Sequence, residues 1–396
     1  MNINTPLALL GNLTPRTFMQ RYWQRQPLLI RQAIPNFKPP LSIAEIKQLA
    51  RRDEVESRLI WRDDAGWGMR NGPFNRLPAR RGKNWTLLAQ GVDLHDDATA
   101  ELMQRFRFIS DARLDDTMIS IACDGGGVGP HFDSYDVFLL QAHGQRRWRI
   151  SSQKDLALVP GLPLKILENF RSEHEYVLNP GDMLYLPPHV AHDGVAIGEC
   201  MTISIGFRAP TLAVLAQGML ETAADQIMAR INGTSDAQDV GALPGPDLSN
   251  TYHDAGAPAT ATPASLPDAL VTAACKAVRK IHFNEALATR FLGQWLTELS
   301  PLAYFEPSSP HINLDSHTPT GWLRLDRCTR LMYRKRQLFL NGEALALPAS
   351  KALRELADTR SLRLGLRRRD TLNHDEQAVL TRWLQEGWLH YIDDRQ

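Results

Sequence analysis

Between Phe106 and Phe207 the sequence is a series of short segments rich in β-branched and aromatic residues, separated by turn signals. These segments predict strands over residues 117–123, 135–141, 146–150, 176–178, 183–186 and 201–207. The turn signals between them include Ala142-His143-Gly144 and Asn179-Pro180-Gly181-Asp182. Because no long helical pattern interrupts the series, it predicts an antiparallel barrel or a double-stranded jelly roll.

The residues before these strands, 1 to about 100, have a mixed pattern. A short helix is expected to open at Thr14 and to carry Phe18 and Trp23. Ser42 and Glu45 have the spacing of a capping box, which predicts a second helix after Ser42.

After Pro210 the pattern becomes helical. Residues 211–231 predict one helix and residues 269–299 predict two. The connection 232–267 is rich in Gly, Ala, Pro, Ser and Asp, which is typical of a flexible surface segment. An apolar stripe in the last helical stretch fits either a core or a subunit interface: Phe283, Leu287, Phe291, Trp295 and Leu299.

The last part of the chain has the element order of a winged helix. Asn341-Gly342 predicts a type I′ turn in a hairpin over residues 337–345. Helices are expected at 350–357 and 375–386, and a strand at 388–392. Because Arg367-Arg368-Arg369 is its one dense basic run, we do not expect this domain to bind DNA.

Length and composition set the broader expectations. A chain of 396 residues predicts two or three domains. We expect an α+β protein with a jelly-roll domain at 1–210, a helical dimerisation region at 211–305 and a winged-helix-like domain at 306–396. The net charge of +1 argues against a nucleic-acid binder that works by bulk electrostatics.

Compartment and membrane association follow from simpler signals. The four cysteines are scattered, without a C-x-x-C pair, which is typical of reduced thiols in a cytoplasmic protein. No signal peptide opens the chain and no run of 18 apolar residues is present, so we expect neither secretion nor a membrane span.

Two histidines and one carboxylate form a candidate metal site. His131 and Asp133 are two residues apart, so on a strand their side chains would leave the same face. His192 follows after the predicted turn and strand, and His189 in the same segment competes with it. Two histidines and a carboxylate are the facial triad of non-haem iron(II) oxygenases. A cupin that binds manganese, nickel or zinc would need a third histidine or a glutamate near His131, and neither has that spacing.

Arg146 is the candidate anchor for an organic co-substrate. Its planar guanidinium suits the distal carboxylate of 2-oxoglutarate, whose keto-acid end would chelate the iron. In the alternative interpretation, residues 145–149 form a solvated strand edge. Strand alternation lets either Arg146 or Arg147 point inward, and we choose Arg146.

Four motifs of the chain resemble the bacterial ribosomal oxygenases of the Jumonji-C (JmjC) family. They are residues 115–138, Arg146-Arg147-Trp148-Arg149, residues 180–188 and residues 206–210, and the similarity extends over nearly the whole chain. The resemblance implies a homodimeric dioxygenase that uses Fe(II), 2-oxoglutarate and O2. Its reaction would be hydroxylation of the β-carbon (C3) of an arginine in a basic ribosomal protein of the large subunit, the sixteenth by the usual numbering.

The same resemblance assigns roles to particular residues. It places the iron ligands, and hence the catalytic centre, at His131, Asp133 and His192, with 2-oxoglutarate on Arg146. It places the substrate arginine on four further residues: Asp116, Met118, Tyr135 and Ser204. A carboxylate, an aromatic ring and a thioether suit a buried guanidinium and its alkyl stem.

Two other functions stay open from the sequence. The same chemistry could act on a histidine or a methyl-lysine of another protein, although a carboxylate at Asp116 favours a cationic side chain. A non-catalytic cupin that binds a metal or a small acid is the alternative from another class.

Overall fold

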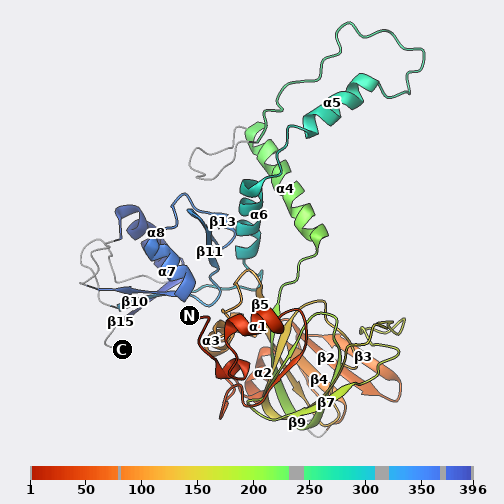
Figure 1. Ribbon diagram of the computed structural model, residues 1–396, viewed down its shortest axis with the longest axis vertical. Coiled ribbons are helices and arrows are strands. Elements are labelled where there is room, and N and C mark those ends of the chain that lie inside the picture. The colour runs from red at the N-terminus through yellow and green to blue at the C-terminus, as the bar shows by residue number, and fades with distance from the viewer. Residues whose placement is uncertain (1, 79–81, 232–244, 308–320, 366–371, 394–396) are drawn as a thin grey trace. The chain divides into compact units, whose positions relative to one another are not determined.

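Figure 1 shows the computed structural model, which describes residues 2–78, 82–231, 245–307, 321–365 and 372–393. The chain divides into two compact units, Met1–Ala209 and Pro210–Gln396. The predicted division into three domains, with a boundary after residue 305, stays a prediction. In the described part of the chain, no helix is both long enough and apolar enough to cross a membrane.

The described residues of the N-terminal unit form five short helices and nine strands. Its helices are η1 (Ala8–Leu10), α1 (Pro15–Arg21), α2 (Ile43–Leu49), η2 (Val92–Leu94) and α3 (Asp97–Gln104). Its strands are β1 (Leu28–Ile30), β2 (Ser57–Asp63), β3 (Gly66–Asn71), β4 (Trp85–Ala89), β5 (Leu114–Ala122), β6 (Val137–Ser151), β7 (His174–Leu178), β8 (Met183–Leu186) and β9 (Ala191–Phe207).

The strands form the predicted jelly roll. They pair antiparallel in the order β1-β8-β6-β9-β5-β4-β2-β3, and β7 also pairs with β6. The first half of β6 pairs with β8 and its second half with β7, while β9 follows β6 along both halves. The two long strands β6 and β9 therefore stay paired from Val137 and Gly206 at one end to Ser151 and Ala191 at the other.

Several predicted boundaries differ from the structure. The predicted turn at Ala142-His143-Gly144 is wrong, because β6 is one strand with two register irregularities there. At the bend Gly144 has a φ of +60°, and a Cβ on it would lie 2.2 Å from the Glu199 carbonyl oxygen. The predicted strand through His131 and Asp133 is also wrong, since that segment pairs at one residue only.

The helices before the jelly roll follow their predicted caps. Thr14 caps α1, and Ser42 and Glu45 form the predicted capping box of α2. Trp23 lies beyond the end of α1, so its predicted place on that helix is wrong. The sequence pattern also missed the strands β1 to β4 in this region.

An aromatic cluster fills the core on one face of the sheet. Phe138 is fully buried, and its ring centroid lies 4.9 Å from those of Phe106 and Tyr185. Phe18 and Phe207 complete the contacts at 5.4 and 5.8 Å. The residues on either side of Phe138, Val137 and Leu139, point to the other face and join a smaller apolar cluster with Trp148 and Ile150 of the second half of β6.

The C-terminal unit contains the predicted helices and the predicted hairpin. Its helices are α4 (Leu212–Ile231), α5 (Asp268–Val278), α6 (Glu285–Thr297), α7 (Lys351–Thr359) and α8 (His374–Gln385). Its strands are β10 (Gly321–Leu325), β11 (Leu331–Arg334), β12 (Gln337–Leu340), β13 (Glu343–Ala344), β14 (Ser361–Leu364) and β15 (Leu389–Asp393). Asn341 and Gly342 both have positive φ, as a type I′ turn requires.

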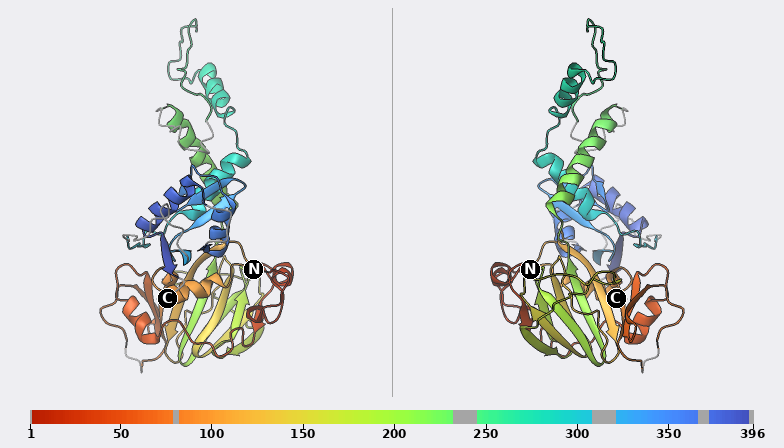
Figure 2. Two further views of the ribbon diagram at one scale, coloured as in Figure 1. Left: turned by 90° about the vertical axis from the view of Figure 1, so that its left-hand side faces the viewer. Right: turned by 90° about the vertical axis from the view of Figure 1, so that its right-hand side faces the viewer.

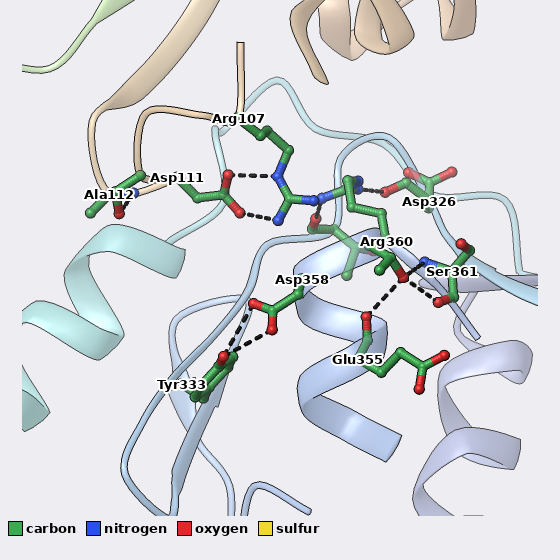
Figure 3. Close-up of polar contacts among 12 residues, drawn as sticks. Arg107, Asp111, Ala112, Asp326, Tyr333, Glu355, Asp358, Arg360 and Ser361 are labelled. Atoms are coloured by element: carbon green, nitrogen blue, oxygen red, sulfur yellow. Dashed lines mark hydrogen bonds and ion pairs between the residues drawn. The ribbon is translucent and has the colours of Figure 1, made fainter. Parts of the chain in front are cut away.

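Within this unit, polar contacts tie the small sheets to α7. The Tyr333 hydroxyl donates to the Asp358 carboxylate at 2.9 Å, and Arg360 donates to the Asp326 carbonyl oxygen at 2.6 Å (Figure 3). Leu287 and Phe291 of the predicted apolar stripe are buried, whereas Phe283 is half exposed and lies before α6. The basic run Arg367-Arg368-Arg369 lies outside the described residues.

Replacing Phe138 should strongly destabilise the N-terminal unit. We expect Phe138→Ala to lower the free energy of unfolding by about 3–5 kcal/mol, because it removes a fully buried ring from the aromatic cluster. Urea unfolding followed by tryptophan fluorescence would measure this, with the partly exposed Leu158 changed to Ala as the control. Equal effects of the two changes would contradict the prediction.

Candidate metal centre

The backbone brings His131 and His192 together. The His131 N–H donates to the His192 carbonyl oxygen at 2.9 Å, and the His192 N–H donates to that of His131 at 2.7 Å. The segment before β6 is otherwise irregular, so this pair fixes it against the start of β9. The His189 N–H adds a bond of 2.7 Å to the Asp133 carbonyl oxygen.

Three side chains converge at this point. The Nε2 atom of His192 lies 3.7 Å from Asp133 Oδ2, and that of His131 lies 4.0 Å from Asp133 Oδ1. One potential ligand atom from each residue lies within 4.8 Å of the others. The structure therefore brings together His131, Asp133 and His192, and leaves the competing His189 exposed with its ring near Phe132.

The backbone also fixes how the two imidazoles are turned. Nδ1 of His131 lies 2.9 Å from the Gly129 carbonyl oxygen, and Nδ1 of His192 lies 2.9 Å from that of Val190. A carbonyl oxygen accepts a hydrogen bond, so each Nδ1 carries the proton and each Nε2 keeps its lone pair. This second contact of the ring is typical of histidines that bind metals.

Burial keeps His192 neutral. Loss of water around its ring, and then the neighbouring His131, lower the pKa of His192 to about 4. A neutral imidazole is the form that donates an electron pair to a cation. Two histidine nitrogens and one carboxylate oxygen on one face of a metal position are the donor set of a facial triad. These residues therefore fit a non-haem iron(II) ion.

Arg146 is buried on β6 with incomplete hydrogen bonding. Only 3% of its surface is exposed, and its Nε atom has no partner among the described residues. One Nη atom lies 3.6 Å from the Cys200 thiol, and the guanidinium lies 5.7 Å from the Trp148 ring centroid. Trp148 in turn packs beside His192, with ring centroids 5.9 Å apart. A buried cation with an unused donor, one aromatic ring away from His192, fits the carboxylate of a bound anion.

A β-bulge displays two aspartates on β5. Leu114 pairs with Phe207 and Thr117 with Ile205, so Asp115 and Asp116 together oppose Gly206. Asp115 is exposed and bonds Arg208 at 3.1 Å. Asp116 is turned toward Gly206, where a Cβ would lie 3.2 Å from its Oδ1 atom, and its Oδ2 accepts the Gly91 N–H at 3.1 Å.

The environment of Asp116 favours its neutral form. Burial, followed by the nearby Asp93 and Asp115 carboxylates, raises the pKa of Asp116 to about 7. A guanidinium beside this carboxylate would relieve the repulsion, because an opposite charge favours ionisation.

The other residues predicted for the substrate lie on the same sheet face or near it. Met118 and Ser204 are direct partners across β5 and β9, and both lie on the face that carries Gly206. Tyr135 lies in the segment between Asp133 and β6, with 39% of its surface exposed. Burial of its hydroxyl and the Asp133 and Asp116 carboxylates raise the pKa of Tyr135.

Sequence reasoning missed further polar residues around Asp116. Arg58 of β2 donates to the Gln90 side chain at 3.0 Å, and Gln90 hydrogen-bonds to Asp116. Asp93 of η2 accepts the Thr117 N–H at 2.7 Å. These residues come from the region that had looked mixed. The run Trp85-Thr86-Leu87-Leu88-Ala89 is typical of a buried strand, and Gln90 and Asp93 follow it directly. This pattern was the sequence signal for a further strand in that region.

Comparison with known families agrees with this fold. A model of the JmjC domain matches residues 101–215, and a model of the ROXA-like winged helix matches residues 279–390. The jelly roll and the three converging side chains thus define the class of cupin-like JmjC proteins.

Individual relatives narrow this class. A ribosomal protein uL16 3-hydroxylase from Escherichia coli K12 is 40% identical over 205 residues, which are 52% of this chain and 55% of the relative. In such alignments the chain spans about half the length of the curated relatives it matches. A crystal structure of the Escherichia coli ribosomal oxygenase YcfD superposes with a TM-score of 0.72 at 30% identity, over 96% of this chain and 98% of that one. The chain therefore belongs to the JmjC ribosomal oxygenase family.

One further solved structure bears on the site. YcfD in complex with cobalt and 2-oxoglutarate superposes with a TM-score of 0.73 at 28% identity, again over 96% of this chain and 98% of that chain.

Removing one ligand should weaken metal binding sharply. We expect His192→Ala to lower the affinity for Co²⁺ or Mn²⁺ by more than about 100-fold, because even a residue that only supports a ligand contributes about 10–100-fold. Isothermal titration calorimetry would measure this, with His189→Ala as the matched control from the same segment. A comparable loss in the control would mean that the metal lies elsewhere.

Proposed function

We propose that this chain is an Fe(II)- and 2-oxoglutarate-dependent dioxygenase that hydroxylates C3, the β-carbon, of an arginine in a large-subunit ribosomal protein. The observation that carries the proposal is the convergence of His131, Asp133 and His192, with a buried Arg146 linked to His192 through Trp148. The proposal is supported by the uL16 3-hydroxylase at 40% identity and by the related structure that holds cobalt and 2-oxoglutarate.

The donor set suits the cofactor and the co-substrate. His131, Asp133 and His192 would hold the iron, and Arg146 would bind the distal carboxylate of 2-oxoglutarate. When bound, iron, 2-oxoglutarate and O2 supply the oxidation: one oxygen atom enters the substrate C–H bond, and 2-oxoglutarate becomes succinate and carbon dioxide.

The protein's own residues bind and orient the reactants. The carbonyl oxygens of Gly129 and Val190 keep each Nε2 atom directed at the metal position. Trp148 packs between Arg146 and His192, so it links the anion site to the ligand set. Holding the reactants in place in this way removes much of the entropic cost of the reaction.

We propose that Asp116, Met118, Tyr135 and Ser204 bind the substrate arginine. The carboxylate would meet the guanidinium, and the thioether and the ring would contact its alkyl stem. A buried carboxylate favours a cationic side chain over a neutral histidine, which supports arginine as the target.

The test is a mass-spectrometric assay of arginine-containing ribosomal-protein peptides with iron, 2-oxoglutarate and air. A gain of one oxygen on an arginine, lost in His131→Ala, would support the proposal. Oxygen on a histidine, or demethylation of a lysine, would keep the chemistry and change the substrate. Absence of both product and 2-oxoglutarate turnover would favour a binding module.

Replacing Arg146 should act on the co-substrate. We expect Arg146→Gln to raise the KM for 2-oxoglutarate by about 30-fold or more, because loss of one partner of a buried charge pair costs about 2 kcal/mol or more. The matched control is Arg147→Gln, since Arg147 is about half exposed and pairs with Glu175. Equal effects of the two changes would place the co-substrate elsewhere.

Substrate binding should depend on pH. With a pKa of about 7, Asp116 is mostly ionised at pH 8.5 and mostly protonated at pH 6. Since only the ionised carboxylate attracts the guanidinium, the KM for the peptide should rise about tenfold as pH falls across this range. Asp116→Asn should raise the KM at pH 8.5 and abolish this dependence. A wild-type KM that is constant with pH would contradict the assignment.

We further propose that the enzyme is a cytoplasmic homodimer. The cytoplasm is where it would encounter a ribosomal protein, and exposed apolar side chains on the helical region would form the dimer interface. Leu212 and Leu220 of α4 and Val278 of α5 are 84%, 60% and 62% exposed. In both views of Figure 2, α5 and the chain before it stand apart from the small sheets of the same unit.

Sedimentation at micromolar concentration should give a dimer mass. Changing Leu220 and Val278 together to Asp should produce monomers, because charges at an apolar interface must be desolvated. A monomeric mass for the unmodified chain would contradict the proposed dimer.

A further inference from the structure

Three carboxylates meet around the bulge of β5, although the proposed chemistry uses only one. Asp115 and Asp116 share the bulge, and Asp93 reaches it from η2. Like charges this close repel one another, which raises the free energy of the folded protein unless a cation or a proton offsets them. Asp93 is 4% exposed, so solvent does little to screen its charge.

The chain from Gly91 to Asp93 contacts the bulge at two points. The Gly91 N–H donates to Asp116 at 3.1 Å, and Asp93 accepts the N–H of Thr117 at 2.7 Å. Thr117 is the first residue at which β5 regains its register with β9. Asp93 therefore holds the residue that follows Asp116, and so fixes the backbone from which the Asp116 side chain projects.

Among the described residues, charged and titratable groups reach Asp116 from β2, η2, β5 and the segment before β6. Asp93 approaches from η2, Asp115 from β5, and Tyr135 from the segment before β6. Asp115 is exposed and paired with Arg208 at the end of β9, which weakens its field. From β2, Arg58 donates to the Gln90 side chain, which in turn hydrogen-bonds to Asp116, and the charge of Arg58 also acts on Tyr135.

We infer that Asp93 is a positioning and specificity-determining residue for substrate binding. It fixes the bulge that carries Asp116, and it adds a second buried negative charge beside the carboxylate that meets the substrate. Two buried acids side by side favour a permanently charged guanidinium over a neutral side chain of similar size. The role of Asp93 rests on the proposed function, because it assumes that Asp116 binds the substrate cation.

Asp93→Asn separates the two contributions of this residue. The amide keeps an oxygen to accept the Thr117 N–H but carries no charge. Without that charge, Asp116 should ionise at lower pH. If its pKa falls by about one unit, the ratio of the peptide KM at pH 6 to that at pH 8.5 should fall from about tenfold to about twofold.

Two further variants complete the set. Asp93→Ala also loses the acceptor for Thr117, so we expect the same flattening together with a higher KM at both pH values. Asp115→Asn, the matched control from the same bulge, should keep most of the pH dependence because Asp115 is solvated and paired. A purely structural role for Asp93 would raise the KM of both Asp93 variants without changing the ratio.

The effect of Asp93 on Asp116 can also be measured without substrate, and so independently of the hydroxylation assay. Carbon-13 NMR of aspartate carboxyl groups would follow Asp116, with its signal identified by its absence in Asp116→Asn. We expect its titration midpoint to move down in Asp93→Asn, and an unchanged midpoint would overturn the inference. If the wild type hydroxylates no arginine, the proposed function fails, while the NMR comparison still decides whether Asp93 acts on Asp116.

Discussion

The backbone pairing of His131 with His192 is the interaction on which the rest of the site depends. It joins an irregular segment to the start of a long strand by two short hydrogen bonds. The backbone pair fixes the Cα positions of the two histidines, and the Nδ1 contacts then fix the orientation of their rings. A site held by main-chain bonds needs few additional side chains to remain in place without its metal.

The sequence predicted the chemistry better than it predicted the backbone. Residue type and order were enough to select His131, Asp133 and Arg146, because few other combinations in the chain offer those ligands. The strand proposed for His131 and Asp133 does not exist, since the geometry comes from one bridge to a residue 61 positions away. Local alternation carries no information about such a distant partner.

Residue type alone could not separate His189 from His192; the family resemblance favoured His192, and the structure brings it beside His131 and Asp133. His189 and His192 have the same chemistry and differ in sequence by only three positions. They are separated by a backbone turn, in which His189 has a φ of +65°. The support around Asp116 was not predicted, because Gln90, Asp93 and Arg58 come close to it only when β2 and β4 pair with their neighbours.

The continuity of β6 has a consequence for how this family can tolerate changes in length. Leu139 pairs with Ser204 and Arg146 pairs with Ala196 on one unbroken strand. The number of residues in β6 therefore fixes the spacing between the substrate end and the 2-oxoglutarate end of the site. Loss of one residue at the Gly144 bend would bring Arg147 to the inward position and still offer a guanidinium. It would also turn Trp148 outward and break its contact with His192. Loss of two residues would restore the alternation but would put Trp148 at the position of Arg146, so this bend should tolerate neither change of length.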